Sequence, residues 1–163
     1  MDGTLAKPCS SCEAGFFCPP GCTDSKLWVC PPGHWCEASA SSPMANPCPE
    51  NTYNPDFGAV NNTSCDPCPE RFFCPEGSKE PHMCRPGNYC GQTDTTEVAC
   101  PPGTFSPQEG QIDNTTCLQC PAGYYCPGGS IRPVPCAQGT YNGTPGQNDL
   151  SHCLPCTAGY ECP

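Results

Sequence analysis

The residues of this sequence whose spacing best suits metal binding or redox chemistry are four Cys-x-x-Cys pairs. They are Cys9–Cys12, Cys65–Cys68, Cys117–Cys120 and Cys153–Cys156. Such pairs bind zinc when two of them lie a short loop apart, and they exchange disulfides when one begins a helix of a βαβ unit. Successive pairs here are 56, 52 and 36 residues apart, which is outside zinc-ribbon spacing, and no βαβ pattern is visible. We therefore expect no metal site and no redox centre.

Side chains that could catalyse a reaction are sparse. The three histidines, His34, His82 and His152, are scattered along the chain. No Gly-x-Ser-x-Gly motif, phosphate loop or pair of carboxylates accompanies them. We expect no catalytic residues, no cofactor and no enzymatic activity.

The composition does not support a hydrophobic core. Leu, Ile, Val and Phe make up 17 of the 163 residues, and such a low share with a net charge of −10 is typical of disordered chains. Cysteine, however, makes up 20 residues, which is the level of a disulfide scaffold. Disulfides persist in oxidising compartments, so we expect the protein to be extracellular, either secreted or at the cell surface.

The charge and hydropathy of the chain argue against two kinds of partner, nucleic acid and the membrane interior. Six Lys and Arg stand against sixteen Asp and Glu, so we expect no nucleic-acid partner. No apolar run reaches 18 residues, and the N-terminus lacks the pattern of a signal peptide, so we expect no membrane insertion in this segment. The chain stops in mid-pattern at "CTAGYECP". We interpret it as a segment of a longer secreted protein.

Two cysteine-bounded units alternate along the sequence. A long loop with sixteen residues between its cysteines occurs three times, with Thr and an aromatic residue four and five residues after the first cysteine and Gly ten after it. A short unit, Cys-x5-Cys, occurs six times, usually with Gly three residues before the second cysteine and an aromatic residue directly before it. We predict divergent N-terminal units over 1–47 and repeats over 48–99, 100–135 and 136–163. The last repeat is truncated at its end.

The repeat suggests how the cysteines pair, because equivalent cysteines should pair equivalently. If every loop closes on itself, all twenty cysteines are used, and each eighteen-residue loop gains about 3 kcal/mol in the chain-entropy model. The alternative interlaces bonds between short units, for example Cys68–Cys84 with Cys74–Cys90. The self-closing scheme consists of Cys48–Cys65, Cys100–Cys117, Cys136–Cys153, Cys12–Cys18, Cys30–Cys36, Cys68–Cys74, Cys84–Cys90, Cys120–Cys126, Cys156–Cys162 and Cys9–Cys22.

These features predict a small disulfide-rich fold. We expect elongated tandem cysteine-rich repeats made of short β-ribbons and irregular loops, with little or no helix, because glycine and proline punctuate the whole chain.

Sequons for N-linked glycans occur at four asparagines, Asn61, Asn62, Asn114 and Asn142. Asn62 and Asn114 lie at the same place, three residues before the second cysteine of a long loop, so the register favours Asn62 over Asn61. Pro145 follows the third sequon and makes it less efficient. Chance also produces sequons in loops rich in Asn and Thr.

The stretches "CPAGYYCPGGSIRPVPCAQGTYN" and "CLPCTAGYEC" resemble the GCC2/GCC3, or ephrin-receptor-like, cysteine-rich repeats, which are similar in style to tumour-necrosis-factor-receptor modules. The resemblance covers Cys48 to Pro163 well and residues 9–47 more loosely. It implies an extracellular disulfide ladder and carries no catalytic residues.

Two functions fit this sequence. The first is a rigid structural segment of an extracellular glycoprotein that forms or decorates a surface filament or matrix fibre, with self-association or other extracellular glycoproteins as partners. The second is the stalk or ligand-binding ectodomain of a cell-surface receptor.

Overall fold

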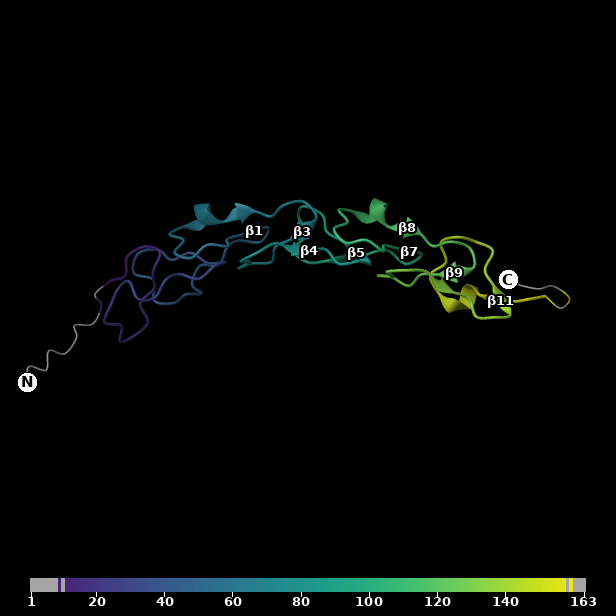
Figure 1. The fold of residues 1–163 in the computed structure, drawn as a ribbon, viewed down its shortest axis with the longest axis horizontal. Helices are drawn as coiled ribbons and strands as arrows, with labels where there is room; N and C mark the ends of the chain where they lie inside the picture. Colours follow the sequence, from purple (N-terminus) through teal and green to yellow (C-terminus); the bar gives the residue numbers. More distant parts are fainter. Residues whose placement is uncertain (1–8, 10, 158, 160–163) are drawn as a thin grey trace, which may run out of the picture. The chain divides into compact units, whose positions relative to one another are not determined.

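The computed structural model describes residue 9, residues 11–157 and residue 159 of the chain. The described residues contain no α-helix; two-residue strands and single 3-10 turns are linked by irregular backbone (Figure 1). The predicted fold class is confirmed in this respect: the protein is small and disulfide-rich, with tandem antiparallel ribbons.

The strands pair in chain order into six two-stranded ribbons. Each ribbon joins neighbours in the sequence, β1–β2, β3–β4, β5–β6, β7–β8, β9–β10 and β11–β12. The strands are β1 (Thr52–Tyr53), β2 (Asp66–Pro67), β3 (Phe72–Phe73), β4 (His82–Met83), β5 (Asn88–Tyr89), β6 (Val98–Ala99), β7 (Thr104–Phe105), β8 (Leu118–Gln119), β9 (Tyr124–Tyr125), β10 (Val134–Pro135), β11 (Thr140–Tyr141) and β12 (Leu154–Pro155). The 3-10 turns are η1 (Asn62–Ser64), η2 (Asn114–Thr116) and η3 (Leu150–His152).

One structural unit underlies both the short units and the long loops. We number it from its first cysteine as position 0. Position 3 has a positive φ angle in all nine units, usually as glycine. Where the pairing register is described, position 4 pairs with the residue before the next first cysteine, as in Thr104 with Gln119. Asn51 and Arg71 are the two positions 3 that are not glycine. The first cysteines are Cys12, Cys30, Cys48, Cys68, Cys84, Cys100, Cys120, Cys136 and Cys156.

Sulfur occupies the interior. Among the described residues, eleven hydrophobic residues are buried, and ten of them are cysteines; Ala59 is the other. The aromatic residues at position 5 are half-buried, except Tyr141, which is exposed. Crosslinks at the centre of each unit therefore take the place that Leu, Ile and Val have in larger domains.

At six junctions, backbone hydrogen bonds join a unit to the next one in a fixed pattern, which we call the junction ladder. Position 3 donates its N–H to the position 6 carbonyl of the following unit. The carbonyl of the first cysteine accepts from the N–H of the second positive-φ residue of the following unit. The N–H at position 6 donates to the carbonyl of the residue after that one. Between the units of Cys84 and Cys100, the bonds run from Gly87 to Ser106, from Gly110 to Cys84 and from Cys90 to Gln111, at 2.8, 2.7 and 2.8 Å.

The junction ladder recurs, complete, at six junctions. Three of them lie in each of the two compact units into which the chain divides. Compact unit 1 comprises Met1–Pro69 and Cys74–His82, and compact unit 2 comprises Glu70–Phe73 and Met83–Pro163. The ladder uses main-chain groups, so it tolerates very different side chains on the surface. The predicted boundaries at 47/48, 99/100 and 135/136 remain a division by sequence alone.

Candidate functional site: the disulfide-closed loops

Nine disulfides close the loops of the described residues, and each joins Cα atoms that are 5.6–5.9 Å apart. All nine follow the self-closing scheme, and the interlaced alternative is absent from this part of the chain. The predicted Cys156–Cys162 bond lies outside the described residues, because Cys162 does. The nine are Cys9–Cys22, Cys12–Cys18, Cys30–Cys36, Cys48–Cys65, Cys68–Cys74, Cys84–Cys90, Cys100–Cys117, Cys120–Cys126 and Cys136–Cys153.

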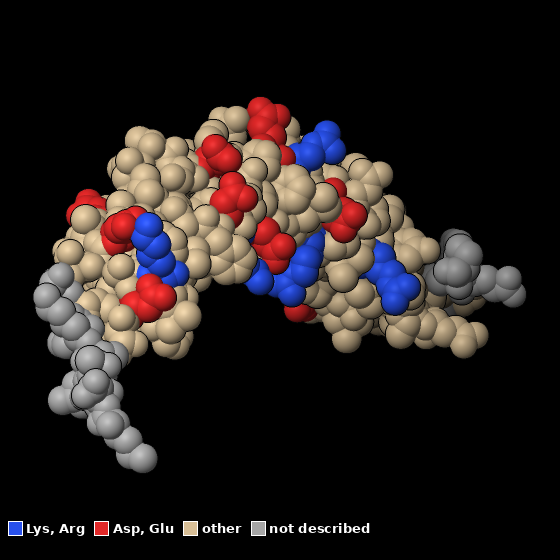
Figure 2. All heavy atoms as spheres, turned by 60° about the vertical axis from the view of Figure 1, so that its left-hand side comes forward, with Lys and Arg blue, Asp and Glu red and all other residues tan. Residues whose placement is uncertain are grey.

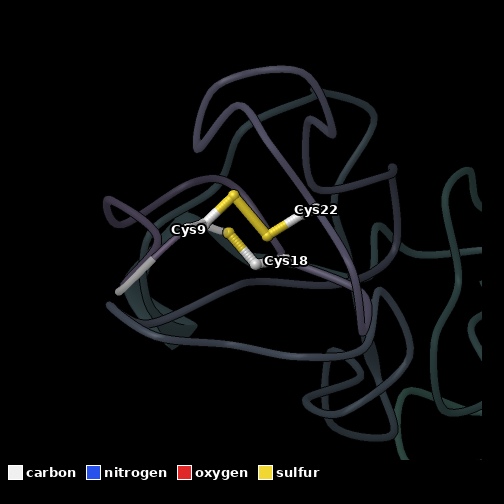
Figure 3. A group of neighbouring side chains, drawn as sticks. All are labelled: Cys9, Cys18 and Cys22. Carbon is white, nitrogen blue, oxygen red and sulfur yellow. A yellow bond between two sulfur atoms is a disulfide. The ribbon is translucent and has the colours of Figure 1, made fainter. Parts of the chain in front are cut away.

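Three sulfur atoms gather in the first unit. The sulfurs of Cys9, Cys18 and Cys22 lie within 4.8 Å of one another (Figure 3). Cys9 is bonded to Cys22, and Cys18 to Cys12, so none of them offers a thiolate. Since the thiolate is the metal ligand, this cluster is a pair of neighbouring crosslinks in the oxidised protein.

In the long loops, a polar residue takes the place of the second cysteine. Position 6 is Asn54, Ser106 or Asn142, with side chains only 1%, 1% and 7% exposed. Each polar side chain hydrogen-bonds the residue two places further on; the Asn54 Oδ1, for example, accepts from the Asp56 N–H at 3.0 Å. The first cysteine bonds instead to the cysteine at position 17.

Sequence reasoning missed this equivalence between long and short units. The signal was present, because both kinds of unit carry a turn residue at position 3 and an aromatic residue at position 5. Gly103 and Gly139 are the position 3 glycines of two long loops, with φ angles of 85° and 82°. A buried Asn or Ser at position 6 shows no cysteine spacing, which hid the relation.

The 3-10 turns fix the second cysteine of each long loop. Asn61, Asp113 and Asp149 cap the three turns, and each side chain accepts a backbone N–H two residues on, at 2.8–3.0 Å. The cysteine that ends each turn donates its N–H to the first residue of the turn. Cap and crosslink therefore hold the same turn from both ends.

The hydrogen bonds of these caps also lower the pKa of two carboxyl groups. Hydrogen bonds from the Thr115 hydroxyl and backbone N–H hold the pKa of the Asp113 carboxyl below its usual value. The Ser151 backbone N–H and hydroxyl lower the pKa of Asp149 in the same way. Asn61, at the same place in the first long loop, has no charge to titrate.

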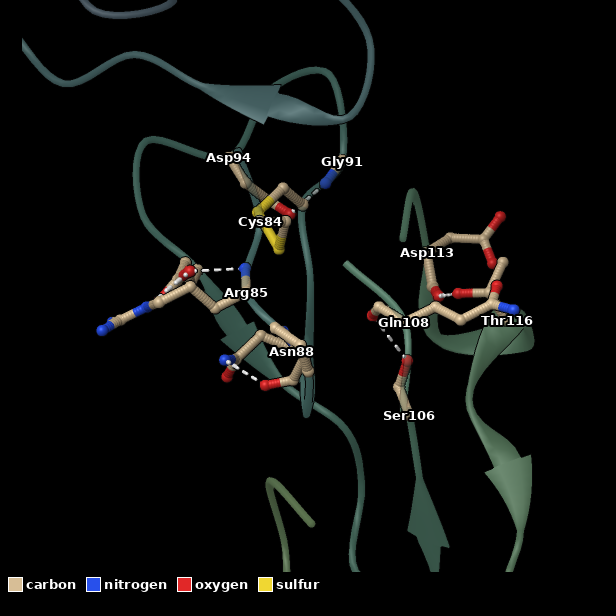
Figure 4. The surroundings of a disulfide bond; sticks show 12 residues. Cys84, Arg85, Asn88, Gly91, Asp94, Ser106, Gln108, Asp113 and Thr116 are labelled. Carbon is tan, nitrogen blue, oxygen red and sulfur yellow. Dashed lines mark hydrogen bonds and ion pairs between the residues drawn. A yellow bond between two sulfur atoms is a disulfide. The ribbon is translucent and has the colours of Figure 1, made fainter. Parts of the chain in front are cut away.

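The surroundings of the Cys84–Cys90 disulfide show how polar groups support a unit (Figure 4). The Gly91 N–H donates to the Asp94 carboxylate at 2.7 Å, which closes the turn after the second cysteine. The Arg85 side chain forms a two-pronged contact with Glu97, at 2.6–3.0 Å. The side-chain hydrogen bond from Arg85 lowers the pKa of Glu97.

The structure separates the four sequons by exposure. Asn62 and Asn114 are each the exposed first residue of a 3-10 turn. Asn61 is exposed too, but its Oδ1 is engaged as the cap, accepting from the Thr63 N–H and hydroxyl.

Asn142 is placed differently. Its Nδ2 donates to the Tyr124 carbonyl at 2.9 Å, and its Oδ1 accepts from the Thr144 N–H at 2.9 Å. With its side chain enclosed, the folded protein does not present this nitrogen to solvent. From this geometry we expect Asn142 to be a poorer glycan acceptor than Asn62 or Asn114 once its loop has folded, a difference that the sequon itself does not show.

Charged side chains are dispersed over the surface. On the face shown in Figure 2, Asp and Glu are scattered among uncharged residues, and Lys and Arg lie between them. Within the described part of the chain, ion pairs join Lys26 with Glu13 at 3.0 Å and Arg85 with Glu97 at 2.6 Å. None of the helices in the part of the chain that the structure describes is long and apolar enough to span a membrane.

The protein is thus a small disulfide-rich repeat protein, and comparison with known proteins adds one relative. The chain is 27% identical over 97 residues to an ABC-type transporter, claG, of Penicillium crustosum. The match covers 55% of this chain and 13% of that protein, so the chain corresponds to a small part of the transporter. No family model matches the chain.

Proposed function

We propose that this chain is a structural segment of an extracellular glycoprotein, one that forms or decorates a surface filament or matrix fibre. The observation that carries the proposal is the junction ladder, which repeats identical main-chain bonds between units closed by disulfides. Such a segment resists proteolysis and unfolding through covalent loops, and its surface stays free to vary. The protein works through its shape and has no catalytic role. The GCC2/GCC3 repeats are the family to which we assign it.

The oxidising environment that the disulfides indicate is the outside of the cell. There, Asn62 and Asn114 carry N-linked glycans, because each side chain projects from an exposed turn. The partners are further copies of the protein or other extracellular glycoproteins, and nucleic acid and the lipid interior are not among them.

Electron microscopy of the native parent protein tests this proposal. A regular fibre labelled by antibodies against this segment is the expected result. Isolated particles attached to membranes would contradict a filament and favour the second candidate.

The second candidate is an ectodomain of a membrane protein. Similarity to a part of a fungal transporter favours it, since a cysteine-rich segment attached to such a protein would face the outside of the cell. In that case the ladder is a spacer or a ligand-binding stalk. The complete transcript discriminates between the two: further repeats favour the fibre, and membrane spans favour the ectodomain.

A further inference from the structure

An exposed apolar surface in compact unit 1 is unexplained by the repeat. It surrounds a groove of about 540 Å³. Three of its side chains are more than half exposed: Phe57 at 71%, Met44 at 64% and Leu27 at 62%. Water contact with so many apolar groups on one face is uncommon in a soluble protein without a binding role. The groove, which we call the apolar groove, is lined by Phe17, Leu27, Trp28, Val29, Pro31, Pro43, Met44 and Phe57.

The fold does not require these apolar residues. The residue two places before the first cysteine is Trp28 here. The next three units have Asn46, Asp66 and His82 at this place. The later units have Val98, Leu118, Val134 and Leu154. Phe57 at position 9 of the first long loop corresponds to Glu109 in the second. Units with polar residues at these places form the same ladder bonds.

The lining offers few groups that could form hydrogen bonds or ion pairs with a ligand. No lining residue is charged, and the rings of Phe17 and Trp28 pack against each other with centroids 5.9 Å apart. The Phe17 N–H already donates to the Trp28 carbonyl at 2.9 Å. An occupant must therefore be held mainly by apolar and aromatic contact, which excludes a free ion.

The charge of compact unit 1 further limits the kinds of molecule that could bind in the groove. Compact unit 1 contains nine acidic and three basic residues, a net charge of −6. Asp56 is exposed next to Phe57, whereas Lys26, next to Leu27, is already paired with Glu13. A second copy, with a charge of −10, would bring like charges together.

We propose that the apolar groove binds a partner protein through an apolar peptide segment flanked by Lys or Arg. The apolar side chains enter between Trp28, Met44 and Phe57, and the basic residues face the acidic surface of compact unit 1. The proposal goes beyond the structural role, because it assigns a specific surface to a second protein.

A pair of synthetic peptides tests this proposal on the intact, oxidised chain. The probes are Lys-Lys-Leu-Pro-Phe-Pro-Leu-Lys-Lys and the same peptide with glutamate in place of every lysine, each titrated by calorimetry. We expect the lysine peptide to bind at least tenfold more tightly than the glutamate peptide at low salt, and the difference to shrink at high salt because screening weakens the charge term.

Matched variants locate the binding. Phe57→Ala and Trp28→Ala should each weaken the lysine peptide at least tenfold, and Leu118→Ala should leave it unchanged, because Leu118 is 52% exposed but lies in compact unit 2. An unchanged disulfide map shows that each variant is folded.

Three outcomes overturn the proposal: no saturable binding of the lysine peptide, binding that Phe57→Ala leaves intact, or equal binding of both peptides. Dimerisation of the chain that Phe57→Ala abolishes would also overturn it, because a second copy would then be the occupant. The test needs neither a fibre nor a membrane, so its result is independent of the proposed structural function.

Discussion

At the scale of single residues, position 3 explains why glycine recurs at a fixed distance from cysteine. Gly87 has a φ of +84°, and a Cβ there would overlap the carbonyl of Gly129, two units further along. Gly123 has the same φ, but a Cβ there would meet nothing within 4 Å. One glycine is thus required for backbone conformation and for packing, and the other for conformation alone.

We expect Gly87→Ala to destabilise the oxidised protein by about 3 kcal/mol, since a left-handed alanine and a steric overlap both contribute. Gly123→Ala is the matched control and should cost about 1 kcal/mol. Denaturant unfolding at constant disulfide content measures both. Equal losses for the two variants would mean that the contact with Gly129 is unimportant.

The sequons give a second prediction at this scale. In protein secreted from a glycosylating eukaryotic cell, glycopeptide mapping should find sugar on Asn62 and Asn114 and none on Asn142, because Asn142 is enclosed and hydrogen-bonded. Ser64→Ala removes the Asn62 sequon and should remove its glycan, whereas Thr63→Ala removes only the Asn61 sequon and should not. Full occupancy of Asn142 would show that modification precedes folding of that loop.

Acid should loosen the second long loop before the first. The pKa of Asp113 is lowered in the folded protein, so its contribution to stability is complete above the unfolded pKa of about 4 and is lost as pH falls through the lower folded pKa. Protection of the Thr115 amide, measured relative to its intrinsic exchange rate, should therefore fall on acidification, while protection at Thr63 stays constant, because its cap is Asn61. A parallel response at both threonines would contradict this role of the carboxylate.

At the scale of elements, the loop is the unit that folds, and the sequence predicted it well. Equal spacing of cysteines led to eight of the nine pairs found in the described residues, and Cys9–Cys22 followed because these two cysteines remained. The density of Gly and Pro led to short ribbons without α-helix. The junction ladder was not predictable, because main-chain bonds leave no side-chain pattern. The polar substitutes Asn54, Ser106 and Asn142 were missed because a buried hydrogen bond there replaces a recognisable cysteine.

Removal of one crosslink should have a local effect. Cys100→Ser with Cys117→Ser opens an eighteen-residue loop, and we expect a loss of about 3 kcal/mol on the chain-entropy model. Hydrogen exchange should increase in that long loop and in the units that its ladder bonds reach, and should stay unchanged in the units of Cys12 and Cys30, because repeats contact only near neighbours. A uniform increase along the chain would show long-range cooperativity instead.

At the scale of the whole molecule, crosslinks and main-chain bonds replace an apolar interior, and this leaves the side chains free for other uses. Among the described residues, ten of the eleven buried hydrophobic residues are cysteines, so the large apolar side chains are either half-buried or exposed. In compact unit 1 several of them gather around the apolar groove, and in compact unit 2 two others, Tyr141 and Leu154, face each other across a ribbon. A scaffold of this kind can acquire binding surfaces without disturbing its fold.

Hydrogen exchange before and after reduction measures whether the disulfides hold the fold. Its probes are the amides that donate in the junction ladder, among them Gly33, Gly87 and Gly103. In the oxidised protein we predict strong protection of these amides, and after reduction and alkylation we predict complete loss of it along the chain. Protection that survives reduction would contradict the account, because the fold would then be held by something other than its disulfides.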